Sequence, residues 1–225
     1  MSKPLITAYN WAPDEGRGLV RDMRVRWALE EVGQAYEVRY LSWGEQKEPA
    51  HRARNPFGQV PAYEEAGDGQ NLVLFESGAI VLHIAERWPG LWPADPAGRA
   101  RAIEWMFAAL NTIEPVVWDQ VVAKVIDGKQ SWAKDRWPSV LERLRVRLGE
   151  LSTALGDKDW LDGEFSAGDL LMVQVLRHVS DPAILAEHPN LKAYVARGME
   201  RPAFKRALEA LQAGQTGEPP ADWPY

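Results

Sequence analysis

Hydrophobic positions in residues 1–89 switch between two periods, which indicates a unit that mixes strands with helices. Residues 5–9 form a short apolar run typical of a buried strand, and residues 36–41 alternate with period two. Between them, apolar positions recur at helical spacing from Val20 until Gly33, where the helix is expected to end. The chain is therefore predicted to begin with a strand, a helix and a second strand.

The next segments predict a hairpin followed by a helix. Residues 60–63 and 72–75 have strand-like composition and flank a Gly/Asp-rich turn at 67–71. Residues 78–88 then return to helical spacing. Strand–helix–strand followed by strand–strand–helix packs most simply as a four-stranded mixed sheet covered by helices, which predicts an α/β fold for this part of the chain.

Residues 95–225 carry helical patterns and no convincing strand, so we expect a second, all-helical domain there, after a domain at 1–89. Asp95 before Pro96 is a helix-start signal, and the pattern continues toward Val125 with a kink expected at Pro115. Further helices are predicted over 138–155, from Ser166, and after each of the prolines 189 and 202, with an irregular tail after Ala213.

The helix that begins at Ser166 has a strong start signal. Ser166 at the N-cap and Asp169 three residues later form a capping-box arrangement, with Asp in place of the usual Glu. Phe165 and Leu170 are placed to form a hydrophobic staple across this start. We predict a buried helix whose stability falls by on the order of 1 kcal/mol or more when Asp169 is replaced by alanine.

Composition narrows the possible functions. The chain of 225 residues contains no cysteine, which excludes disulfides, thiolate metal sites and a cysteine nucleophile. Its four histidines include no HExxH motif, so no metal is expected. The net charge of −6 argues against nucleic acid and anionic membranes as partners. No long apolar segment is present, so we expect a soluble cytoplasmic protein.

Four segments together resemble the cytosolic glutathione S-transferases. They are VRWALEEVG at 25–33, NPFGQVPAYEE at 55–65, FESGAIVLHIAERW at 75–88 and FSAGDLLMVQVL at 165–176. The resemblance implies a thioredoxin-like N-terminal domain with a mixed four-stranded sheet, and a helical-bundle C-terminal domain. It also implies glutathione as a co-substrate, a small hydrophobic electrophile as the second substrate, and a homodimer, for which apolar residues near 75–105 are candidates.

The same resemblance assigns residues to a glutathione site. Pro61 is expected to be a cis-proline, so that the backbone of Val60 pairs with the extended tripeptide. Glu76 and Ser77 are expected to hold the γ-glutamyl amine and carboxylate, because Ser77 opens a helix whose free N–H groups favour an anion. Gln59 is placed to bond the peptide backbone or the glycine carboxylate. One of the basic residues Lys47, His51, Arg52 and Arg54 is expected to pair with that carboxylate.

The position that should face the glutathione sulfur departs from the family pattern. A donor there favours the thiolate, because the free thiol is mostly protonated at neutral pH. The loop after the first strand holds no Ser, Thr or Cys at residues 10–19. The remaining candidates for the catalytic donor are Tyr9, Asn10, Trp11 and Arg17. The other arginines of this segment, at 21, 24 and 26, are expected to lie on a solvated helix face or in salt bridges at the domain interface.

Three functions remain open at this point. The first is a glutathione transferase that attacks a hydrophobic electrophile, with Trp11, Trp105, Phe107 and Trp118 as candidate walls of an apolar pocket. The second is a glutathione-dependent disulfide or peroxide reductase, in which glutathione supplies the sulfur. The third is a non-catalytic, glutathione-transferase-like binding protein, which the missing Ser or Cys favours.

Overall fold

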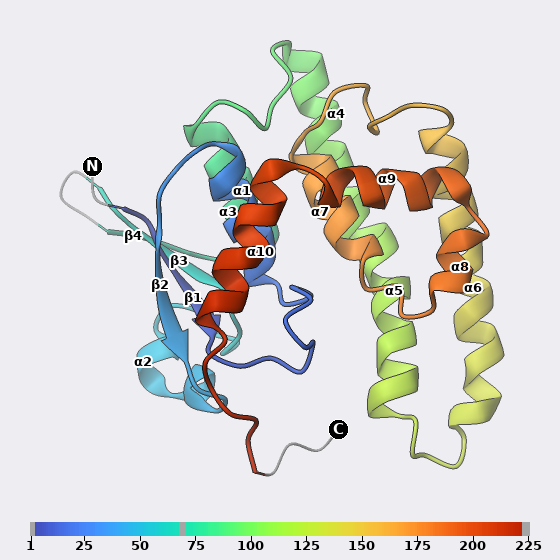
Figure 1. Ribbon diagram of the computed structural model, residues 1–225, viewed down its shortest axis with the longest axis horizontal. Helices are drawn as coiled ribbons and strands as arrows, with labels where there is room; N and C mark the ends of the chain where they lie inside the picture. Colours follow the sequence, from blue (N-terminus) through green and yellow to red (C-terminus); the bar gives the residue numbers. More distant parts are fainter. Residues whose placement is uncertain (1–2, 68–70, 222–225) are drawn as a thin grey trace. The chain divides into compact units, whose positions relative to one another are not determined.

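The computed structural model describes residues 3–67 and 71–221 (Figure 1), and contacts within the chain divide it into two units. One unit runs to Leu91 and also takes up the segment from Arg201 onward. The other comprises Trp92–Glu200. The last helix therefore packs with the first unit, although it follows the second in sequence. The division of the chain into domains at 1–89 and 95–225 stays a prediction.

The first unit is built on the predicted four-stranded mixed sheet. Its strands are β1 Leu5–Tyr9, β2 Glu37–Leu41, β3 Ala62–Ala66 and β4 Asn71–Phe75. The order across the sheet is β2-β1-β3-β4, with β1 parallel to β2 and β3 antiparallel to both β1 and β4. This thioredoxin-like arrangement confirms the predicted fold. Of the predicted hairpin turn at 67–71, residues 68–70 lie outside the described residues.

Helices cover both faces of this sheet, and alternate residues of β3 meet different helices. The helices are α1 Asp22–Glu31, α2 Pro49–Arg52 and α3 Ser77–Arg87, with a short 3-10 turn, η1, at Glu45–Lys47. Glu65 of β3 bonds His83 of α3 at 3.0 Å, whereas its neighbour Glu64 bonds Arg54, just after α2, at 2.8 Å. The period-two pattern thus places α2 and α3 on opposite faces.

The helix α10 Pro202–Gly214 covers α1 from outside the sheet (Figure 1). Phe204 meets the buried Trp27 edge to face at 5.1 Å between ring centroids. Arg201 makes a two-point ion pair with Glu31, at 2.6 and 2.8 Å. Because α1 lies between the sheet and α10, it is buried on more than one side.

This burial rules out a solvated helix face for Arg24 and Arg26, although Arg26 does form a salt bridge, within its own helix. Arg24 and Arg26 are 2 % and 1 % exposed. The Arg26 guanidinium pairs with Asp22 at 2.8 Å, one turn earlier, and lies over the ring of Tyr40 at 5.9 Å. A buried guanidinium needs such a carboxylate partner, because an unpaired buried charge is costly.

The second unit is helical, as predicted. Asp95 caps the first helix by accepting a hydrogen bond from the Gly98 amide at 2.7 Å, and Gly156 ends a later helix with φ 58°. The helices are α4 Pro96–Phe107, α5 Glu114–Val121, α6 Ala133–Leu155, α7 Ala167–Leu176, α8 Pro182–Ala186 and α9 Pro189–Met199. The short helix α8 has no counterpart among the predicted elements.

The structure adds detail to one prediction about these helices and corrects another. The chain accommodates Pro115 after a π-helical segment, η2 Ala108–Ile113, since proline cannot donate the usual backbone hydrogen bond. A second π-helical segment, η3 Val122–Ile126, follows α5. The helix predicted from residue 138 begins at Ala133 instead, and Pro138 lies inside it. Because proline has no N–H, one backbone hydrogen bond near the start of α6 is missing.

The predicted capping box of α7 is confirmed, and the Asp169 carboxylate also accepts hydrogen bonds from residues outside the box. One carboxylate oxygen accepts from the amide and hydroxyl of Ser166, at 3.0 and 3.1 Å. The other accepts from the Leu161 amide and the Tyr194 hydroxyl, both at 2.9 Å. Every residue of α7 is buried, so this carboxylate ties a loop and α9 to the central helix of the unit.

No helix within residues 3–67 and 71–221 is long and apolar enough to cross a membrane.

Candidate functional site

The first turn of α3 combines several hydrogen-bond donors. Ser77 is 5 % exposed, and its hydroxyl oxygen accepts a hydrogen bond from Nη1 of the buried Arg24 at 3.2 Å. Within the described part of the chain nothing accepts the hydrogen of that hydroxyl, so it remains available to a ligand. The first backbone N–H groups of α3 have no partner inside the helix, and the helix dipole favours negative charge there. Together these groups have the charge and the donors that suit an anion.

Glu76, which precedes this turn, has an unusual backbone conformation. Its φ of 68° and ψ of 113° lie in a region that residues other than glycine rarely adopt. Such a conformation costs on the order of 1–3 kcal/mol and persists most often at binding sites. The Glu76 side chain is exposed beside Ser77, so a carboxylate that can accept from an ammonium group lies next to the first turn of α3.

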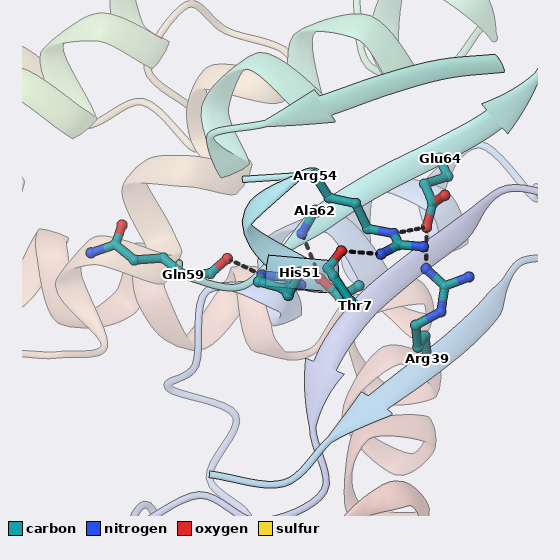
Figure 2. A network of polar contacts seen from close by, with 8 residues as sticks. Thr7, Arg39, His51, Arg54, Gln59, Ala62 and Glu64 are labelled. Carbon is teal, nitrogen blue, oxygen red and sulfur yellow. Dashed lines mark hydrogen bonds and ion pairs between the residues drawn. The ribbon is translucent and has the colours of Figure 1, made fainter. Parts of the chain in front are cut away.

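The Val60–Pro61 peptide bond is cis, which confirms the prediction for Pro61. The next amide, of Ala62, donates to the Thr7 hydroxyl at 2.7 Å, so this segment is attached to β1 (Figure 2). Among the described residues, the backbone N–H and C=O of Val60 have no hydrogen-bond partner. An extended peptide can therefore pair with Val60 as an added strand would.

The segment before Val60 is held from the other side. The Gln59 carbonyl accepts from Nδ2 of Asn55 at 2.9 Å and lies 2.8 Å from Nε2 of His51. His51 is 3 % exposed, so it supports this segment from within the unit. Figure 2 shows the exposed Gln59 side chain extending away from these contacts, where it is accessible to a ligand.

The predicted basic residues all make contacts within the unit. Arg54 bonds Glu64 at 2.8 Å and the Ala50 carbonyl, and Arg39 pairs with the same carboxylate (Figure 2). Although burial raises the pKa of Glu64, the bonds from Arg54 and Arg39 hold it below its usual value. Arg54 thus joins α2 to the sheet, and its proposed contact with a glycine carboxylate stays a prediction.

Two further basic residues line the same segment. Nζ of Lys47 donates to the Gly58 carbonyl at 2.8 Å and to the Phe57 carbonyl at 3.3 Å. Nε of Arg52 donates to the carbonyl of Lys47 at 2.9 Å. Both residues are exposed, so the structure leaves open which basic residue would meet a ligand carboxylate.

Tyr9, at the end of β1, is half-buried with its ring 5.1 Å from that of Trp43. Burial, with a smaller contribution from Asp22, raises the pKa of Tyr9 to about 12. The phenol is therefore protonated at neutral pH and acts only as a neutral hydrogen-bond donor. That property suits a group that stabilises a thiolate, but it does not by itself distinguish Tyr9 from the other candidates.

The other candidates lie in the β1–α1 loop, residues 10–19. The side-chain amide of Asn10 donates to the Ser42 hydroxyl at 3.2 Å, and Trp11 is half-buried. Nε of the exposed Arg17 donates to the Asp14 carbonyl at 3.0 Å. The question of which group faces a bound sulfur stays open among Tyr9, Asn10, Trp11 and Arg17.

Sequence reasoning missed the residues that organise this region. The buried Asp14 carboxylate accepts from the amides of Gly16 and Leu19, at 3.1 and 2.6 Å, and so shapes the β1–α1 loop. Arg24 supports Ser77 from α1, and Asn55 holds the Gln59 carbonyl. Only Asn55 lay in a segment that the motifs had singled out. The part of the chain that the structure describes contains no cluster of three metal-ligating side chains.

Comparison with known proteins gives consistent matches along the chain. Residues 15–86 match the family model "Glutathione S-transferase, N-terminal domain", and residues 105–202 match the corresponding C-terminal domain. Glutathione S-transferase 1 of Triticum aestivum is 31 % identical, over 84 % of this chain and 89 % of its own length. Glutathione S-transferase 1 of Zea mays is 29 % identical, over 82 % and 89 %.

Solved structures agree with these matches. A glutathione transferase from Burkholderia graminis, crystallised with two glutathione molecules bound per subunit, has a TM-score of 0.79 and 25 % identity. The match covers 92 % of this chain and 88 % of that one.

Proposed function

Because this chain belongs to the glutathione S-transferase family, we propose that it binds glutathione and activates its thiol for attack on a hydrophobic electrophile. The main support for the proposal is the first turn of α3. There the Ser77 hydroxyl accepts a hydrogen bond from the buried Arg24 and lies beside backbone N–H groups that have no partner within the helix. The γ-glutamyl carboxylate binds to this turn, and the γ-glutamyl ammonium meets Glu76.

The rest of the tripeptide extends from this turn along Val60. The unpaired N–H and C=O of Val60 hold the cysteinyl residue of glutathione as an added strand. The Gln59 side chain is accessible to the peptide backbone or the glycine end. Binding in this direction brings the thiol to the end of β1 and the β1–α1 loop, where Tyr9, Asn10, Trp11 and Arg17 are the candidate donors. One of them stabilises the thiolate. Binding both reactants side by side provides the remainder of the rate enhancement.

Calorimetric titration of glutathione, paired with turnover of an aryl halide, tests this proposal. We expect saturable binding and glutathione-dependent product formation. The matched control is γ-glutamyl-alanyl-glycine, which keeps both ends of glutathione but lacks the thiol. It should bind comparably and give no product. Failure of glutathione to bind the wild-type chain contradicts the proposal.

The two alternative functions give different results in the same assays. Binding without aryl halide turnover, but with glutathione-dependent reduction of a peroxide or disulfide, identifies a reductase. Such an enzyme uses only glutathione thiols, because the chain has no cysteine to form a mixed disulfide. Binding without either reaction identifies a non-catalytic binding protein.

We also propose that the chain forms a homodimer through exposed apolar side chains of the first unit. Phe57 is 63 % exposed beside Phe75, and Leu72 and Val73 of β4 are about two-fifths exposed, at 38 % and 40 %. Exposed apolar groups of this kind are typical of surfaces buried on association. Light scattering at micromolar concentration should give twice the mass of one chain. The Phe57→Glu variant should give a mass closer to that of a single chain. A wild-type mass equal to one chain contradicts the dimer.

A further inference from the structure

The end of α10 and the residues that follow it lie directly against the β1–α1 loop. The Gln212 side-chain amide donates to the Gly16 carbonyl at 2.9 Å. The backbone amide of Gly217 donates to the Asn10 carbonyl, also at 2.9 Å. These two bonds hold the loop near both of its ends, and they come from a segment about two hundred residues away in sequence.

Glycines occur on both sides of this contact, and the close packing accounts for them. A Cβ placed on Gly217 would lie 2.6 Å from Oδ1 of Asn10, and one on Gly18 would lie 2.8 Å from the Leu208 side chain. A Cβ on Gly214 would overlap the Tyr40 hydroxyl. Heavy atoms cannot approach this closely without moving one of the partners. The packing of α10 and its following residues against the loop and against β2 therefore leaves no room for a side chain at these positions.

The loop has little regular support of its own. Glu15, Gly16 and Gly18 all have positive φ, at 53°, 72° and 68°, and the Asp14 carboxylate bonds two amides of this segment from within. A chain with these dihedrals makes no repeating backbone hydrogen bonds, so its position depends on what packs against it. Asn10 also bonds Ser42, which ties the start of the loop to the end of β2.

We propose that Gln212 and Gly217 are positioning residues, which fix the β1–α1 loop so that its donor meets the sulfur of bound glutathione. This inference rests on the proposed function, because it assigns the two residues to the reactive end of that site. The contacts act on the loop backbone at Asn10 and Gly16, on either side of Trp11 and next to Arg17. A displacement of about 1 Å at the reacting group is enough to lower a rate by up to a hundredfold.

Amide hydrogen exchange in the full-length chain tests the structural part without relying on any activity. We expect Gln212→Ala and Gly217→Ala each to speed exchange in residues 10–19 by on the order of tenfold, because opening of the loop becomes easier. Glu209→Ala removes a similar exposed side chain from α10 and should leave exchange in the loop unchanged. If the loop of both variants exchanges at the same rate as in the wild type, the proposal is overturned.

The pH dependence of turnover then separates a positioning role from a merely structural one. In both variants we expect kcat with an aryl halide to fall about tenfold and the apparent pKa of the bound thiol to rise, while the glutathione Kd stays within about threefold. Faster exchange with an unchanged kcat and pH profile overturns the positioning role. If the wild-type chain neither binds nor uses glutathione, the proposed function fails, and the exchange result still decides whether α10 holds the loop.

Discussion

Replacing Asp169 by alanine should lower the free energy of unfolding by roughly 3 kcal/mol or more. The carboxylate is fully buried and accepts four hydrogen bonds, two from Ser166 and one each from Leu161 and Tyr194. Alanine removes the carboxylate acceptor of all these donors, although the Tyr194 hydroxyl keeps a long contact, 3.5 Å, to the backbone carbonyl of residue 169. Each buried donor left unsatisfied adds a penalty. For a chain of this size the loss corresponds to a melting temperature lower by roughly 6–12 °C. Thermal and urea unfolding followed by circular dichroism measure it.

Asp181→Ala is the matched control for this change. Asp181 also caps a helix, α8, but it is exposed and accepts one hydrogen bond, from the Ala183 amide at 2.9 Å. Its replacement should cost about 1 kcal/mol, the usual value for an N-cap. Equal losses in the two variants would mean that the buried network around Asp169 adds nothing to ordinary capping.

Replacing Ser77 by alanine should weaken glutathione binding by roughly tenfold to a hundredfold. The hydroxyl donates to a carboxylate in the proposed complex, and a hydrogen bond to a charged group is worth about 1.5–3 kcal/mol. The change also leaves Nη1 of the buried Arg24 without its 3.2 Å contact to the hydroxyl, so the turn itself becomes less well placed. Calorimetric titration of glutathione into the variant gives the ratio of dissociation constants directly.

Ser139→Ala is a suitable control, because Ser139 is an exposed serine of α6 whose hydroxyl donates to the Arg136 carbonyl at 2.9 Å. The Ser139→Ala variant should bind glutathione with the same affinity as the wild type. If Ser77→Ala binds as tightly as the wild type while its melting temperature is unchanged, the γ-glutamyl carboxylate does not bind at α3.

The elements that could be predicted from sequence are those whose signals are local. The strand β1 follows from an apolar run, the α4 start from Asp95, and the α7 start from Ser166 with Asp169. In each case the residues that specify the element lie within a few positions of one another. The mixed sheet followed because a strand–helix–strand and a hairpin have few ways to pack together.

What could not be predicted depends on contacts between residues distant in sequence. Arg24 looks like a solvent-facing helix residue until α10 and α3 are known to cover α1. Arg54 looks like a ligand for a carboxylate, and only the sheet reveals that Glu64 already supplies one. The predicted start of α6 at residue 138 is wrong, because the chain is already helical from Ala133 and continues through Pro138.

The placement of α10 in the first unit has a consequence for how the protein is made. The ribosome releases the chain from its N-terminus, so the sheet and α1 emerge well before Phe204, which covers Trp27. At the usual rate of synthesis, the second unit takes on the order of ten seconds to appear in between. During that interval the nascent first unit exposes the apolar side of α1, which makes it a natural client for chaperones. A fragment ending at Leu91 would stay permanently in that unfinished state.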